Sequence, residues 1–81
     1  MIRAKVIVTL KPGVSDVQGI TVQQTIAKLD FPEVQKVRVG KYFELELDGA
    51  AEELRPKLDA ICETVLSNPV IEDYEYTIEE I

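Results

Sequence analysis

The sequence predicts a two-layer α+β domain in which two helices cover one face of an antiparallel sheet. Apolar and polar residues alternate in three separate stretches, and this period of two indicates strands. Apolar residues recur at intervals of three and four in two further stretches, which indicates amphipathic helices. A proline or a glycine follows most of these stretches, as expected where elements end. The expected order is strand, helix, long strand or hairpin, helix, strand, in a single domain over residues 1–81.

The first strand is expected to end before Pro12, because proline has no backbone donor for a sheet ladder. Gly13 then permits the positive φ of a tight turn. One face of this strand is expected to be buried. The apolar side chains on that face are Ile2, Ala4, Val6, Val8 and Leu10.

The first helix is expected over Asp16–Leu29. Ser15 and Asp16 are both suitable N-caps, and Ser15 with Gln18 has the spacing of a capping box. Gly19 belongs to the apolar stripe, although glycine lowers helix stability relative to alanine. We therefore expect another backbone segment to approach the helix closely at Gly19.

Residues 34–48 allow two interpretations, because most of their apolar side chains have odd numbers: Val37, Val39, Phe43, Leu45 and Leu47. A two-residue hairpin turn at Gly40-Lys41 would place apolar and polar side chains on the same face. Continuous parity instead requires a three-residue hairpin loop, or one long strand that bends near Gly40 and exceeds the usual length of about three to ten residues. Such a strand exposes a pairing edge that a two-fold partner would complete. We favour this second interpretation, a long central strand shared across a dimer.

The second helix is expected to begin near Glu53, because Pro56 is harmless only in a first helical turn. The residue pair Asn68-Pro69 ends this helix. A last strand follows, with Val70, Tyr74, Tyr76 and Ile78 on one face.

The composition excludes several classes of function. A net charge of −6 argues against nucleic acid as a partner, since such a partner requires a basic surface. The single cysteine, Cys62, cannot form an intrachain disulfide or a multi-cysteine zinc site, and its apolar helical context is typical of a small buried side chain. No stretch has the pattern of a signal peptide or of a membrane span. We expect a cytoplasmic protein without a membrane partner.

Catalytic constellations are also missing from the sequence. There is no histidine to activate Ser15 or Cys62, no glycine-rich phosphate loop, and no cluster with metal-ligand spacing. The acidic residues near the C-terminus have the pattern of a solvated surface. We expect neither catalysis nor a bound cofactor or metal from this chain alone.

Three stretches nevertheless combine turn-forming residues with polar side chains. Residues 10–19 form, on local physics, a well-capped connection between a strand and a helix. Residues 37–41 place two cations around Gly40, which fits either protection of an edge strand or a contact with the carboxylates of a partner. Residues 68–74 fit either a helix stop or a docking loop.

Taken together, these stretches resemble the PurS family, the small subunit of phosphoribosylformylglycinamidine synthase. The matching motifs are Lys11-Pro-Gly-Val-x-Asp-x-Gln-Gly19, Val37-Arg-Val-Gly-Lys41 and Asn68-Pro-Val-Ile-Glu-Asp-Tyr74, and the resemblance covers essentially the whole chain. Three positions depart from the family pattern: Ser15 from a common leucine, Val17 from a frequent proline, and Asp30 from a frequent glycine. The first two affect the rigidity of the helix cap, and the third affects the turn after the helix.

The resemblance implies a non-catalytic but required subunit of an ATP- and glutamine-dependent ligase in de novo purine biosynthesis. In such a complex a glutaminase subunit releases ammonia, and a large synthetase subunit binds ATP and formylglycinamide ribonucleotide. A PurS-like homodimer or homotetramer bridges the two and supports ammonia transfer. By position, the resemblance marks these partner-interface candidates: Lys11, Gly13, Asp16, Gln18, Gly19, Arg38, Gly40, Lys41, Asn68, Pro69 and Glu72.

Two other interpretations stay open at this point. One is a dimeric α+β regulatory module that senses a small molecule bound between its subunits. A thermal shift with an amino acid or nucleotide, without other subunits, would favour it. The other is a dimeric scaffold for an unrelated partner, which a pull-down recovering neither a glutaminase nor a synthetase would favour.

Overall fold

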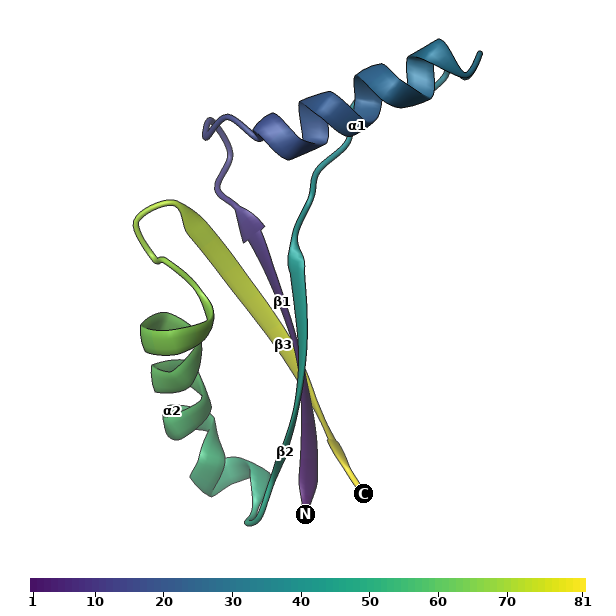
Figure 1. Cartoon of the computed structure of the whole chain (residues 1–81). Coiled ribbons are helices and arrows are strands. Elements are labelled where there is room, and N and C mark those ends of the chain that lie inside the picture. Colours follow the sequence, from purple (N-terminus) through teal and green to yellow (C-terminus); the bar gives the residue numbers. More distant parts are fainter.

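The computed structural model describes all 81 residues and contains a three-stranded antiparallel sheet and two α-helices (Figure 1). The α+β class predicted from the periodicities is confirmed. The elements in chain order are β1 Ile2–Leu10, α1 Val17–Lys28, β2 Lys41–Leu47, α2 Ala51–Ile61 with a π-helical continuation Cys62–Leu66, and β3 Glu72–Glu80.

The sheet has the strand order β2-β1-β3, so the first strand of the sequence is its centre. β1 pairs in antiparallel register with both neighbours, and Val6 lies opposite Phe43 on one side and Tyr76 on the other. The expectation of a long central strand after α1 is therefore corrected: β2 has seven residues and lies at an edge. Its outer side has no partner strand in the chain, as expected of an edge that remains available for pairing.

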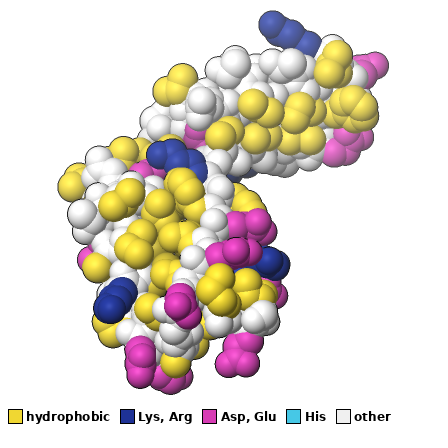
Figure 2. All heavy atoms as spheres, turned by 60° about the horizontal axis from the view of Figure 1, so that its bottom comes forward, with side chains coloured by type: hydrophobic (Ala, Val, Ile, Leu, Met, Phe, Trp, Pro, Cys, Tyr) yellow, Lys and Arg dark blue, Asp and Glu magenta, His cyan; other side chains and the backbone are white.

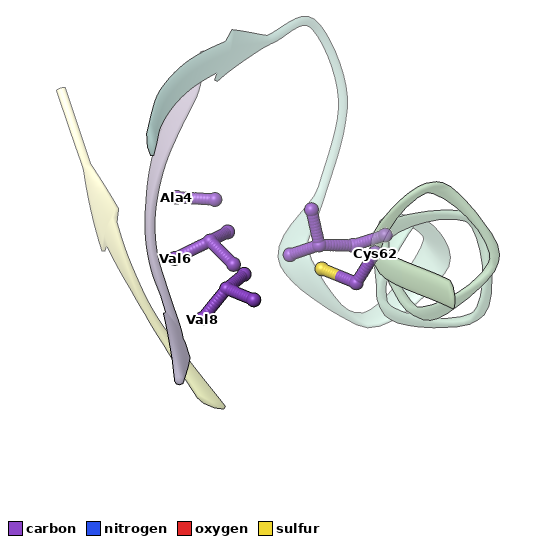
Figure 3. Close-up of a cluster of buried hydrophobic side chains, with 5 residues drawn as sticks. Ala4, Val6, Val8 and Cys62 are labelled. Atoms are coloured by element: carbon purple, nitrogen blue, oxygen red, sulfur yellow. The ribbon is translucent and has the colours of Figure 1, made fainter. Parts of the chain in front are cut away.

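The core lies between the sheet and α2. Ala4, Val6 and Val8 project from β1 toward Cys62 of the helix, and the side chains are fully buried (Figure 3). Leu58 completes this cluster. Burial raises the pKa of the Cys62 thiol, which fits the predicted role of a small buried apolar side chain.

The start of α2 differs from the expectation. The N–H groups of Glu53 and Leu54 both donate to the Ala50 carbonyl at 3.1 Å, and the helix begins at Ala51. Pro56 is therefore inside the helix rather than in its first turn. It is exposed to solvent, so the carbonyl that loses its intrahelical donor can bond water instead.

α1 does not cover the sheet beside α2 as expected; it extends past the end of the sheet (Figure 1). The radius of gyration is 16.1 Å, against about 12 Å for a compact domain of this length. Of the α1 residues only Gly19 is buried, while Val17 is 71% and Ile20 50% exposed. Figure 2 shows hydrophobic side chains in a row along this lobe of the surface. The apolar stripe predicted for α1 thus has no cover within the chain.

The segment between α1 and β2 also differs from both expectations. Residues 34–40, here called the strap, are neither helix nor strand, and the chain makes no hairpin at Gly40. Gly40 lies against β1, and a Cβ atom on it would be 2.6 Å from the Val8 carbonyl oxygen. The glycine therefore permits a close approach of two backbones where the strap enters β2.

Candidate functional site

All three motifs of the sequence meet at one end of the sheet. Leu10 at the end of β1 lies opposite Glu72 at the start of β3, and Val8 lies opposite Lys41 at the start of β2. The β1–α1 loop, the strap and the turn before β3 are thereby neighbours (Figure 1). The structure places every predicted interface candidate at or beside this end: Lys11, Gly13, Asp16, Gln18, Gly19, Arg38, Gly40, Lys41, Asn68, Pro69 and Glu72.

Asp16 is the N-cap of α1, and Ser15 makes no capping hydrogen bond. One carboxylate oxygen of Asp16 accepts from the Gly19 N–H at 2.8 Å, and the other accepts from the Val39 N–H of the strap at 2.8 Å. The hydrogen bond from Val39 and then that from Gly19 hold the pKa of Asp16 below its ordinary value. The carboxylate is therefore both a helix cap and a tie between α1 and the strap.

Gly19 has the close backbone contact that its position in the apolar stripe predicted. A Cβ atom at Gly19 would clash with the Val37 carbonyl oxygen of the strap. Gln23 adds a hydrogen bond from its side-chain amide to the Val34 carbonyl at 3.4 Å. The strap thus runs along α1 from its second turn to its N-terminus.

A cavity of about 300 Å³ opens between the β1–α1 loop, the first turns of α1 and the strap. We call it the cationic cleft, because Lys11, Lys36 and Arg38 all line it. Cationic side chains are visible where the α1 lobe meets the rest of the molecule (Figure 2). Gly13, Asp16 and Gly19 complete the part of its lining that the sequence singled out.

The turn before β3 is held by its own polar groups. The Asn68 N–H donates to a Glu72 carboxylate oxygen at 2.7 Å, and the Asn68 side-chain oxygen accepts from the Val70 N–H at 3.1 Å. Glu72 also lies 3.9 Å from the Lys41 ammonium across the sheet. Asn68, Pro69 and Glu72 therefore shape an exposed turn, on which Val70 is 78% exposed, and do not line the cleft.

Two charged residues of this region were not singled out from the sequence. Asp73 accepts a hydrogen bond from the Lys11 ammonium at 2.7 Å. Asp73 lies opposite Thr9, so strand alternation would have placed it on the face of Lys11. Lys36 reaches the cleft only because the strap follows α1, and no local pattern indicates that path.

The charged and polar groups at this end of the sheet lie on the surface. No three His, Cys, Asp or Glu side chains are grouped so that they could hold a metal ion. The Tyr74 and Tyr76 rings stack against each other beside α2, and both hydroxyls bond Asp59. Burial, followed by the charge of nearby Glu63, raises the pKa of Tyr74 to about 12. None of the helices is long and apolar enough to cross a membrane.

Comparison with known proteins assigns the family. The family model PurS, described as phosphoribosylformylglycinamidine (FGAM) synthase, matches residues 3–80. The chain belongs to the PurS family. It is 43% identical to the phosphoribosylformylglycinamidine synthase subunit PurS of Bacillus subtilis, covering 100% of this chain and 96% of that protein. The PurS subunit of Methanocaldococcus jannaschii is 37% identical over 100% of this chain and 99% of the relative.

Solved PurS structures share the fold. A structure of B. subtilis PurS superposes with a TM-score of 0.92 at 44% identity, covering 99% of this chain and 100% of that one. A chain in the structure of PurLQS from Thermotoga maritima gives a TM-score of 0.85 at 28% identity, covering 98% and 99%. The family resemblance inferred from the three motifs is confirmed.

Proposed function

We propose that this chain is the small, non-catalytic subunit of the phosphoribosylformylglycinamidine synthase complex in purine biosynthesis. Membership of the PurS family over residues 3–80 carries this proposal. The similar B. subtilis and M. jannaschii proteins are named as subunits of this enzyme, and the T. maritima PurLQS structure contains a chain of the same fold. The lack of a metal-binding cluster and of histidine is compatible with a subunit that does not itself catalyse the reaction.

In this proposal the chain bridges a glutaminase subunit and a large synthetase subunit in the cytoplasm. Ammonia released from glutamine then reaches the synthetase without dilution into solvent. ATP and glutamine are used by the complex as a whole, and this chain holds no cofactor. Its contribution is to place two active centres at a fixed distance and orientation.

The bridging unit in this proposal is a homodimer, or a homotetramer built from it. The apolar stripe on α1 lacks cover in the chain, with Ile20 50% and Leu29 65% exposed. The outer edge of β2 also lacks a partner strand. A second copy that covers the helix and extends the sheet satisfies both features. Sedimentation equilibrium is expected to give at least twice the monomer mass, and a monomer at micromolar concentration would contradict the dimer.

Co-elution tests the bridging role directly. The glutaminase and synthetase subunits are passed together through a sizing column, with and without this chain. The three proteins are expected to elute as one species only when the chain is present. Co-elution of the glutaminase and synthetase subunits in the absence of this chain would contradict the bridging role.

A further inference from the structure

Charges of both signs line the cationic cleft without neutralising one another. Asp16 lines it together with Lys36 and Arg38. The pKa of Asp16 is lowered first by the Val39 and Gly19 hydrogen bonds and then by the charge of Arg38, so the two charges lie within electrostatic range. Even so, Asp16 and Arg38 form no ion pair, and Lys36 forms none either, in a chain with 15 acidic residues.

Backbone hydrogen bonds keep these opposite charges apart. The two carboxylate oxygens of Asp16 accept from the Gly19 and Val39 N–H groups, each at 2.8 Å. The Arg38 guanidinium donates to the Leu10 carbonyl at 2.7 Å. Neither side chain can turn toward the other without losing these bonds. The guanidinium nevertheless keeps free N–H donors that match a carboxylate, and each carboxylate oxygen keeps a second lone pair.

A ligand with only one sign of charge fits this lining poorly. A phosphate or a lone carboxylate would be attracted by the cations and repelled by Asp16, which already occupies the Gly19 amide at the start of α1. A zwitterion avoids this conflict, because its ammonium group meets the carboxylate while its own carboxylate meets the cations. In an α-amino acid one carbon joins the two groups, so with a hydrogen bond of about 2.8 Å at each end the ligand spans a gap too wide for a direct ion pair.

Two glutamine side chains in the lining add neutral polar groups. Gln23 donates from its side-chain amide to the Val34 carbonyl at 3.4 Å, and Gln35 donates to the Pro32 carbonyl at 3.3 Å. Their side-chain oxygens remain available as acceptors, which suits a ligand that carries further N–H donors. The cleft volume of about 300 Å³ lies at the lower end of the range for small-molecule sites.

We propose that the cationic cleft binds one free α-amino acid with a side-chain amide, its carboxylate on Arg38 and Lys36 and its ammonium group on Asp16. Glutamine has this chemistry and is the probe used below. The bound amino acid links the N-terminus of α1 to the strap. Binding is therefore expected to raise the melting temperature. This site goes beyond the bridging role and does not depend on it.

The test is an NMR titration of the full chain with L-glutamine, followed at the Gly13, Gly19 and Val39 amides. The wild type is expected to show saturable shifts with a Kd of about 1 mM or below. The double variant Arg38→Gln, Lys36→Gln is expected to bind at least about tenfold more weakly. The control variant Lys28→Gln, Lys57→Gln, which removes two cations outside the cleft that make no ion pair, is expected to bind as the wild type does. Shifts that do not saturate, or equal affinities of the two variants, would overturn the proposal.

Ligand analogues give a second measurement in which the protein stays wild type. N-acetylglutamine lacks the ammonium group, the α-amide of glutamine lacks the carboxylate, and glutamate replaces the side-chain amide with a second carboxylate. Each is expected to bind at least about tenfold more weakly than glutamine. An analogue that binds as tightly as glutamine would overturn the contact that it removes.

Inorganic phosphate is the last arm, and it is expected to bind more weakly than glutamine. Phosphate that saturates the same amide shifts at lower concentration would assign the cleft to a free anion and overturn the proposal. These titrations use the chain without partner subunits. Their failure would therefore leave the bridging role standing, and a failed co-elution of the complex would leave the amino-acid site standing.

Discussion

The backbone N–H of Val39 donates to the Asp16 carboxylate at 2.8 Å, although the two residues are 23 positions apart. The other oxygen of the same carboxylate caps α1 through Gly19. Because α1 extends past the sheet, this one side chain ties the helix to the strap that leads into β2 (Figure 1). The direction of α1, and the shape of the cationic cleft beneath it, therefore depend on Asp16.

Replacement of Asp16 tests that dependence. Asp16→Ala removes both acceptors and is expected to lower the melting temperature and to accelerate hydrogen exchange at the Val39 and Gly19 amides. Asp16→Asn keeps one acceptor and is expected to lie between the alanine variant and the wild type. Unchanged exchange at Val39 in the alanine variant would show that the strap is held by other contacts.

The same carboxylate predicts a pH dependence. The pKa of Asp16 is lowered from its ordinary value of 3.8, chiefly by the Val39 hydrogen bond. A lowered pKa means that the ionised form stabilises the folded state, so the stabilisation is complete above the unfolded pKa and disappears as the pH falls through the folded pKa. The Val39 amide shift is expected to titrate with a midpoint below 3.8 in the wild type, and not in Asp16→Asn. A midpoint at or above the ordinary value would contradict the two hydrogen bonds.

Alanine substitutions at two glycines distinguish the cost of steric crowding from the cost of backbone strain. Gly19→Ala places a methyl group against the Val37 carbonyl and is expected to destabilise the chain by about 1–3 kcal/mol, as overpacking does. Gly13→Ala meets no atom within 4 Å, and its φ of +88° predicts a smaller loss of about 1 kcal/mol from strain alone. Urea unfolding of both variants gives the comparison. If Gly19→Ala were as stable as the wild type, the strap would have to shift away from α1 without a loss of stability.

Substitution of Asp30 is expected to have the opposite effect and to stabilise the fold. It adopts a φ of 72° just after α1, in the left-handed region that favours glycine. Asp30→Gly removes this strain and is expected to raise the free energy of unfolding by about 0.5–1 kcal/mol, after the larger entropy of the unfolded glycine is counted. Glu33→Gly, at an exposed position whose side chain makes no hydrogen bond or ion pair, is expected to give no such gain. An Asp30→Gly chain that melts lower than the wild type would contradict the prediction.

Periodicity predicted the strands and helices well because each signal is local. Ile2, Ala4, Val6 and Val8 of β1 do face the core, whereas Leu10 is only half-buried and lines the cleft. Gly19 does contact another backbone segment. The strap was misjudged because its parity matches a strand. Its hydrogen-bond partners are the Asp16 carboxylate and the Leu10 carbonyl at the end of β1, and no period in the sequence reveals these contacts. The position of α1 was misjudged for a related reason: an amphipathic stripe shows that a face requires cover, but not which chain supplies it.

The candidate site was predictable in part. The three motifs gave residues that the sheet register gathers at one end, and Lys11, Asp16 and Arg38 do line one cleft. Lys36 lines the same cleft only because the strap runs along α1, and the sequence did not predict that path. The pairing of Lys11 with Asp73 could be predicted only from the register of β1 with β3.

The most direct test of the bridging role compares two nitrogen sources in a reconstituted reaction. Glutaminase and synthetase subunits are assayed for formylglycinamidine ribonucleotide with ATP and either glutamine or an ammonium salt, in the presence and absence of this chain. The account predicts that glutamine-dependent synthesis requires the chain, whereas synthesis from ammonium salt proceeds without it. Full glutamine-dependent activity in its absence would contradict the role of this chain as the bridge.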